Sequence, residues 1–191
     1  MLFEKLRQVT QLQHQKLETK LVEKIRSVTS PADYTQLLTL FHGYFGGLGL
    51  LIDKQPMETY LPDYAERRKI SALAADLDFW GVEGVPRLAT QDQLPSITNH
   101  LEALGALYVM EGSTLGGRII SQMIRSRLRL NGETKAGFSF FESYGSKTEE
   151  MWDLFKGAFQ SDWLPKNEAY ITHTASETFE KFAEAFDRHY P

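Results

Sequence analysis

Apolar residues recur along almost the whole chain at the three- to four-residue spacing of amphipathic helices. The first such stretch covers residues 2–27. Ser30-Pro31-Ala32-Asp33 then supplies the N-cap and first turn of a second helix. The apolar pattern of that helix runs into four glycines between residues 43 and 49, where we expect the helix to bend or break.

The remainder of the chain predicts further helices separated by proline and glycine. Asn131-Gly132 ends a long helical pattern, and Trp163-Leu164-Pro165 interrupts the chain before the last one. No stretch alternates with the period of two that marks a strand. We therefore predict one all-α domain over residues 1–191, a multi-helix bundle of six to eight helices. Its later helices are expected at residues 66–79, 94–130 (one long helix or two abutting ones), 148–160 and 167–188.

Composition and charge narrow the class of protein. Hydrophobic residues make up 42% of the chain and charged residues 24%, the balance of a soluble globular domain. The net charge of −4 gives no reason to expect nucleic acid or an anionic membrane as a partner. No run of about 18 apolar residues is present to span a membrane. The first residues are charged from position 4, unlike a signal peptide, so we expect a cytoplasmic protein.

The chain contains no cysteine. Disulfides, thiolate-ligated haem, covalently attached c-type haem and cysteine-held iron–sulfur clusters are therefore excluded. Any metal or haem must be held by His, Asp, Glu, Tyr or Met.

His14 lies on the apolar side of the first predicted helix. At 100° per residue it falls within the arc of Leu17, Leu21 and Ile25. A histidine facing the core needs partners for its ring nitrogens. Haem iron is one such partner, since imidazole is its common protein ligand. A hydrogen bond to a carbonyl or to Glu18, one turn away, is the structural alternative, and the wheel alone does not choose between them.

The other four histidines lack a ligand-like context. His42 stands among aromatic residues and is interpreted as a packing residue, whereas His100, His173 and His189 are interpreted as surface or helix-end positions. Neither His-x-x-x-His nor Glu-x-x-His spacing occurs, so the usual patterns of zinc and bundle-type di-iron sites are missing.

A helical stretch in the middle of the chain carries glycines at 105, 112, 116 and 117. Each glycine in a helix costs about 1 kcal/mol relative to alanine, so some compensating interaction is expected. The first three lie within about 40° on the helical wheel and form a bare strip beside Tyr108. The strip suits either close packing of another helix or a flat ligand lying against the backbone.

Two separated segments carry a recognisable pattern: Leu6-Arg7…Thr10…His14…Leu17-Glu18, and Leu104-Gly105-Ala106-Leu107-Tyr108-Val109-Met110-Glu111-Gly112-Ser113-Thr114-Leu115-Gly116-Gly117. They resemble the proximal and the distal helix, respectively, of the haem oxygenase family, in particular of its bacterial biliverdin-forming members. The later features Gly137…Phe140-Phe141 and Trp152…Phe155 are also similar, so the resemblance covers most of the chain.

The resemblance implies roles for residues of both segments. His14 would ligate the iron of haem b, which is both substrate and cofactor, and Glu18 would bond the second ring nitrogen. Arg7 would reach a haem propionate, and Tyr108 would border the haem. The glycines Gly112, Gly116 and Gly117 would let a kinked distal helix approach the other haem face.

Two positions fit the family pattern less well. Vertebrate members carry an aspartate where this chain has Ser113, so the residue that orders distal water differs here. Basic residues near the penultimate helix bind propionates in the family, and Lys156 is near that place without aligning with it.

The implied reaction converts haem, O₂ and external electrons to biliverdin, CO and iron, and we expect α-meso cleavage. The chain has no flavin or nucleotide motif, so a ferredoxin or a flavoprotein reductase is the expected electron donor. Three alternatives remain at this stage: a haem carrier or sensor of the same fold, a related helical enzyme with a different reaction, and a structural interaction module.

Overall fold

The computed structural model describes residues 2–67, 70–130, 135–160 and 168–191, and no strand occurs among them. The all-α prediction is therefore confirmed. Short 3₁₀ turns at 64–66, 91–93, 145–147 and 158–160 join the helices. The α-helices are α1 (Leu2–Ser27), α2 (Pro31–Ile52), α3 (Met57–Tyr60), α4 (Ser71–Phe79), α5 (His100–Arg127), α6 (Ser139–Glu142), α7 (Thr148–Gly157) and α8 (Glu168–His189).

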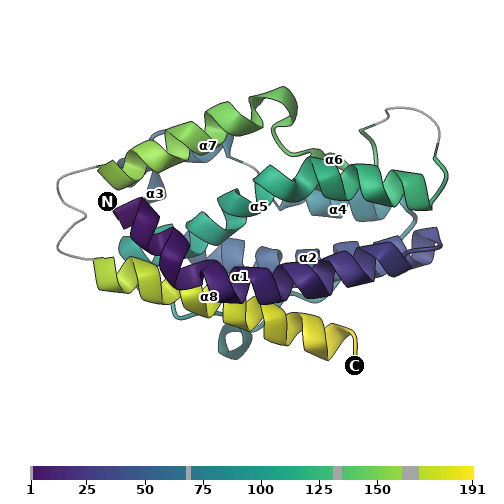
Figure 1. Ribbon diagram of the computed structural model, residues 1–191, viewed down its shortest axis with the longest axis horizontal. Helices are drawn as coiled ribbons and strands as arrows, with labels where there is room; N and C mark the ends of the chain where they lie inside the picture. The colour runs from purple at the N-terminus through teal and green to yellow at the C-terminus, as the bar shows by residue number, and fades with distance from the viewer. Residues whose placement is uncertain (1, 68–69, 131–134, 161–167) are drawn as a thin grey trace.

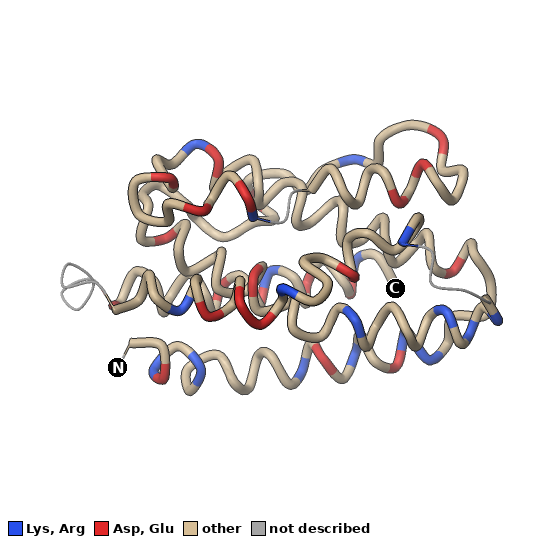
Figure 2. The backbone as a smooth tube through the Cα atoms, turned by 90° about the horizontal axis from the view of Figure 1, so that it is seen from above, with Lys and Arg blue, Asp and Glu red and all other residues tan. Residues whose placement is uncertain are grey.

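The central helix of the fold is α5, which packs against α8, α6, α2, α7 and α1. Figure 1 shows α1 and α8 side by side, with α5 crossing the molecule between them and α7. Two exposed ion pairs join α1 to α8: Lys5 Nζ lies 2.6 Å from Glu168, and Lys20 Nζ lies 2.5 Å from Asp187. Figure 2 shows basic and acidic residues interspersed along the helices.

Side-chain caps determine where the two longest central helices begin. The Ser30 hydroxyl accepts a hydrogen bond from the Asp33 amide, and the Asp33 carboxylate accepts one from the Ser30 amide, which is a capping box. Hydrogen bonds from Thr29 and Ser30 lower the pKa of Asp33 to about 2. Asn99, in extended backbone, accepts from the Leu101 and Glu102 amides and so starts α5 at His100.

Several predicted boundaries were wrong. The long helix does not begin at residue 94, because the Asn99 cap fixes its start, and it is one helix rather than two abutting ones. The helix predicted from 66 begins at Ser71, and α7 ends at Gly157 with a 3₁₀ turn in place of its last predicted residues. The predicted breaks at Asn131-Gly132 and at Trp163–Pro165 lie outside the described residues.

At the glycines of α2, where a bend or break was expected, no break occurs, and the helix continues to Ile52. These glycines admit the segment at residues 87–89 instead. A Cβ on Gly47 would lie 2.7 Å from the carbonyl oxygen of Ala89, and one on Gly43 would lie 3.2 Å from that of Arg87. The Ala89 amide donates a 2.8 Å hydrogen bond to the Gly43 carbonyl. The glycines therefore serve a close backbone approach in an uninterrupted helix.

The core is built around α2, which is long and apolar enough to cross a membrane by length and composition alone. However, 61% of its most apolar window is buried within the fold. Tyr34 and Tyr44 are fully buried on it and donate hydrogen bonds to the carbonyls of Gly137 and Thr178. Such tertiary hydrogen bonds are those of a core helix.

Candidate functional site

A cavity of about 620 Å³ lies beside α1 and α5, which supply most of its lining. Its volume is within the usual range for small-molecule sites, about 300–1,000 Å³. The remaining walls come from aromatic residues of α2, α6, α7 and α8. Phenylalanines predominate among them: Phe41, Phe45, Phe140, Phe141, Phe179 and Phe182.

His14 projects from α1 into this cavity and is 57% exposed at its side chain. Its ring meets the ring of Phe179 edge to face, with centroids 5.6 Å apart. Its Nδ1 atom lies 3.9 Å from a carboxylate oxygen of Glu18, which also lines the cavity. That separation exceeds hydrogen-bond length. The histidine is therefore an accessible imidazole in an apolar cavity and not a core residue held by Glu18.

The glycines of α5 fall into two groups. Gly112 and Gly116 line the cavity: a Cβ on Gly112 would make an ordinary 3.6 Å contact with Trp152, and one on Gly116 would meet no packed neighbour within 4 Å among the described residues. Gly105 and Gly117 serve packing, because a Cβ there would collide with the carbonyl oxygens of Ile171 and Phe141, respectively. Gly117 is thus the predicted site residue that the cavity does not include.

Tyr108 and Ser113 line the cavity between these glycines. Burial raises the pKa of the Tyr108 phenol, although its hydrogen bond with Thr10 acts in the opposite direction. The Tyr108 ring packs edge to face on Phe3, with centroids 5.7 Å apart. The Ser113 hydroxyl donates a 2.7 Å hydrogen bond to the Met110 carbonyl, so its proton points back into its own helix.

Of the two basic residues considered for propionates, the structure brings only Arg7 to the cavity. Arg7 lines it with a side chain that is 71% exposed, and its Nε lies 3.1 Å from the carboxylate of Glu4. Lys156 is not among the lining residues and pairs with Asp153 on its own helix at 2.5 Å.

The remaining histidines lie away from the cavity. His42 is buried on α2, where burial lowers its pKa and its Nδ1 has no hydrogen-bond partner among the described residues. His100 stacks on Tyr60 with ring centroids 3.9 Å apart. His173 is exposed on α8, and His189 is the last residue of that helix. Within the part of the chain described, no three His, Asp or Glu side chains gather into a metal-binding group.

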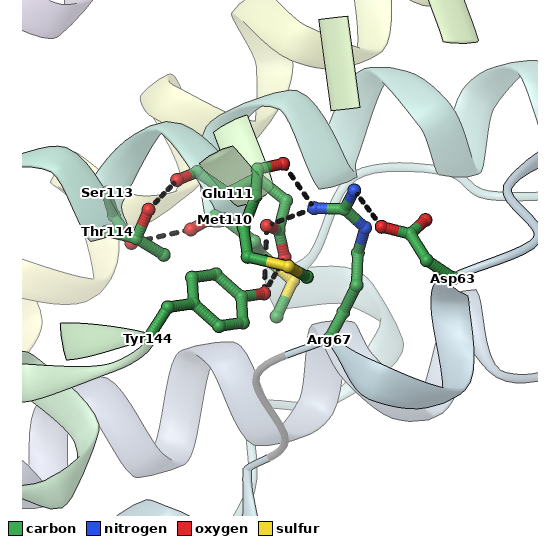
Figure 3. Close-up of polar contacts among 8 residues, drawn as sticks. Asp63, Arg67, Met110, Glu111, Ser113, Thr114 and Tyr144 are labelled. Carbon is green, nitrogen blue, oxygen red and sulfur yellow. Dashed lines mark hydrogen bonds and ion pairs between the residues drawn. The ribbon is translucent and has the colours of Figure 1, made fainter. Parts of the chain in front are cut away.

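A buried polar cluster behind the glycine strip was not predicted from the sequence. Arg67 donates to a Glu111 oxygen at 2.7 Å and to an Asp63 oxygen at 2.6 Å, and the Tyr144 hydroxyl lies 3.0 Å from Glu111 (Figure 3). Arg67 and Glu111 are each 3% exposed. Glu111 is a charged residue inside an otherwise apolar run, which is the one feature of the sequence that indicates a buried partner. The cluster borders a second cavity of about 320 Å³.

A family model described as heme oxygenase matches residues 1–188 of the chain. No curated protein matches it.

Proposed function

The chain belongs to the haem oxygenase family, and from that premise we propose that it cleaves haem with O₂ and external electrons to biliverdin, CO and free iron. The observation that supports this proposal is the pairing of accessible His14 on α1 with bare backbone at Gly112 and Gly116 on α5, in one apolar cavity. A flat apolar molecule with a central metal needs these two features: an axial nitrogen ligand, and a wall that side chains do not obstruct.

The residues present fit haem. Apolar and aromatic side chains provide the environment that a porphyrin needs, and Arg7 is the lining cation available to a propionate. Haem supplies the iron that binds O₂ and the porphyrin edge that is oxidised. The chain supplies the geometry around both.

In the proposed mechanism His14 would hold the haem iron through a ring nitrogen. Glu18 lies beside Nδ1 and would orient the ring and raise its basicity, directly or through water. On the α5 side, Gly112 and Gly116 would present backbone without side chains to the other face of a bound haem. Trp152 and the phenylalanines of the lining would exclude bulk water from the cavity.

Ser113 follows Gly112 in the cavity lining, and its hydroxyl would help to order water there. It donates a 2.7 Å hydrogen bond to the Met110 carbonyl, which fixes the orientation of the hydroxyl. Electrons come from a separate ferredoxin or flavoprotein reductase in the cytoplasm. We also propose α-meso cleavage, with Arg7 at the propionate edge.

Haem reconstitution followed by reduction under O₂ tests the proposal. We expect a Soret band on haem binding that decays with the appearance of a bilin and CO. In His14→Ala the Soret maximum should shift, and added imidazole should restore it. His173→Ala, which removes an exposed histidine outside the cavity, is the matched control. A Soret band that persists under reduction and O₂ would mean a haem carrier or sensor, and identical spectra for wild type and His14→Ala would refute the ligand assignment.

A further inference from the structure

Arg67 joins three parts of the fold through one guanidinium group. Its Nη1 donates to Glu111 of α5 at 2.7 Å and to the carbonyl of Met151 on α7 at 3.2 Å, and its Nη2 donates to Asp63 at 2.6 Å. The side chain is 1% exposed. Figure 3 shows the guanidinium between the two carboxylates, with Tyr144 on the far side of Glu111.

The two helical groups that Arg67 binds are each one residue away from a cavity-lining residue. Glu111 precedes Gly112, and Met151 precedes Trp152. Gly112 and Trp152 face each other across the α5–α7 contact, where a Cβ on Gly112 would lie 3.6 Å from the indole ring. Arg67 itself does not line this cavity but borders the second one. It therefore links the Glu111 carboxylate of α5 to the Met151 backbone of α7 from behind this wall.

A second line of contacts runs from Arg67 to the indole. The Arg67 Cζ lies 5.2 Å from the centroid of the Phe155 ring, and that ring stacks on Trp152 with centroids 5.6 Å apart and planes inclined at 25°. Phe155 is fully buried. Because the guanidinium is planar and rigid, its hydrogen bonds and its contact with Phe155 are set together. A shift of Arg67 would thus displace both the Met151 backbone, which precedes Trp152, and the Phe155 ring, on which Trp152 stacks.

The energetics of this arrangement favour a positional role. A buried ion pair gains little over apolar residues of similar size, because desolvation offsets the attraction. What apolar residues do not provide is a fixed fork of hydrogen bonds to defined acceptors.

We propose that Arg67 is a positioning residue that sets the separation of the Gly112 backbone from Trp152, and through it the meso carbon at which haem is cut. The positional link, from Arg67 to the separation of Gly112 and Trp152, concerns the haem-free protein. The control of the cleavage position rests on the proposed haem cleavage.

Fluorine NMR of haem-free protein labelled with 5-fluorotryptophan tests the positional link between Arg67 and Trp152. The chain has three tryptophans, and Trp152→Phe and Trp80→Phe variants assign the two described ones. Arg67→Lys keeps the charge but removes the fork. We expect it to shift the Trp152 resonance and to leave that of Trp80 in place, since Trp80 bonds to the Gly137 carbonyl elsewhere in the fold.

Arg125→Lys is the matched control. Arg125 is a second largely buried arginine, paired with Glu142 and stacked 3.9 Å from the centroid of Phe138. Phe138 packs against Trp80, with centroids 5.9 Å apart. This variant should therefore shift the Trp80 resonance and not that of Trp152. An unchanged Trp152 resonance in Arg67→Lys would overturn the proposal.

Product analysis of the haem-loaded variants tests the control of the cleavage position. Arg67→Lys should turn over haem with a several-fold higher fraction of minor bilin isomers, and with little change in KM. In the double variant Arg67→Met, Glu111→Met, which leaves no unpaired charge on these two residues, we expect thermal stability near wild type but the same mixture of isomers. A wild-type isomer ratio in both variants would refute control of the cleavage position. Absence of any bilin from wild type would refute haem cleavage itself, and the fluorine spectra would still decide the positional link.

Discussion

Gly116 and Gly117 are adjacent on α5 but face different surroundings. A Cβ on Gly116 would lie in open space in the cavity, with no packed neighbour within 4 Å in the described part of the chain. A Cβ on Gly117 would collide with the carbonyl oxygen of Phe141 on α6. Successive helical residues point about 100° apart, so one glycine of the pair serves the cavity and the other serves packing.

This difference predicts opposite effects of alanine at the two positions. Gly116→Ala should stabilise the haem-free protein by about 0.5–1 kcal/mol, because alanine favours the helix and meets no neighbour. Gly117→Ala should destabilise it by about 1–3 kcal/mol, because α6 must shift. Urea unfolding measures both changes.

Gly116→Ala should also change the reaction of the haem-loaded protein. Gly116→Ala puts a methyl group into the cavity, and we expect slower turnover or altered isomers despite its greater stability. Gly105→Ala, which would collide with the Ile171 carbonyl of α8, is the control for a packing glycine. If Gly116→Ala destabilised the protein as much as Gly105→Ala does, our assignment of Gly116 to open space would be incorrect.

Glu18→Gln should change the electronic character of a haem held by His14. The carboxylate lies 3.9 Å from Nδ1, and a neutral amide there would make the ring a weaker electron donor. We expect a more positive reduction potential of the iron, measured by spectroelectrochemistry, and about tenfold weaker haem binding. Glu23→Gln, an exposed carboxylate on α1 that does not line the cavity, should leave both quantities at their wild-type values. Equal potentials in the two variants would remove Glu18 from the mechanism.

Arg7→Ala tests the propionate contact. Because the side chain is 71% exposed and pairs with Glu4 across one turn, its loss should change the free energy of unfolding by less than about 0.5 kcal/mol. Haem affinity should fall and the bilin isomers should become mixed, since an anchor of in-plane rotation is lost. Lys5→Ala removes a neighbouring α1 cation that pairs with Glu168 outside the cavity, and it should leave affinity and isomers unchanged. The same isomer ratio in Arg7→Ala and Lys5→Ala would contradict the assignment.

The burial of His42 predicts that the stability of the protein depends on pH. Burial lowers its pKa from 6.5, so the folded protein binds fewer protons than the unfolded chain when the pH falls below that value. The stability that depends on neutral His42 is therefore fully present above pH 6.5. It is lost as the pH falls from this unfolded value through the lower pKa of the folded state. Burial lowers the pKa values of His100 and His189 as well, so their effects have the same sign.

Urea unfolding between about pH 5 and pH 7.5 measures this effect, in the range where histidine titrates. We expect wild type to lose stability on acidification and His42→Gln to lose less over the same interval. The exposed His173→Gln should follow the wild-type slope. A wild-type slope in His42→Gln would show that His42 carries none of the dependence.

The sequence predicted those parts of the fold that local interactions decide. Helical spacing placed residues 2–27 on one helix, and α1 has those bounds. The wheel put His14 with Leu21 and Ile25, and all three line the cavity. Ser30 and Asp33 marked the start of α2 because a capping box involves only neighbours in the chain.

The tertiary structure decided the features that depend on contacts between distant residues. The α2 glycines predicted a bend or break, yet the helix is unbroken, and the backbone of residues 87–89 lies close against two of these glycines. Likewise, the buried pair of Glu111 and Arg67 was not predicted, because the two residues are 44 positions apart and no periodicity identifies such a pair. The role of each α5 glycine depends on whether a carbonyl from another element approaches it.

The sequence by itself thus determined the helical class, the first helix and the face on which His14 lies, because hydrogen bonds and apolar spacing within a helix are local. Only the tertiary structure decided which glycines are bare toward the cavity and how Arg67 joins Glu111 to Met151 behind them. Those features arise where separate helices meet, and close packing between elements is a property of the assembled fold.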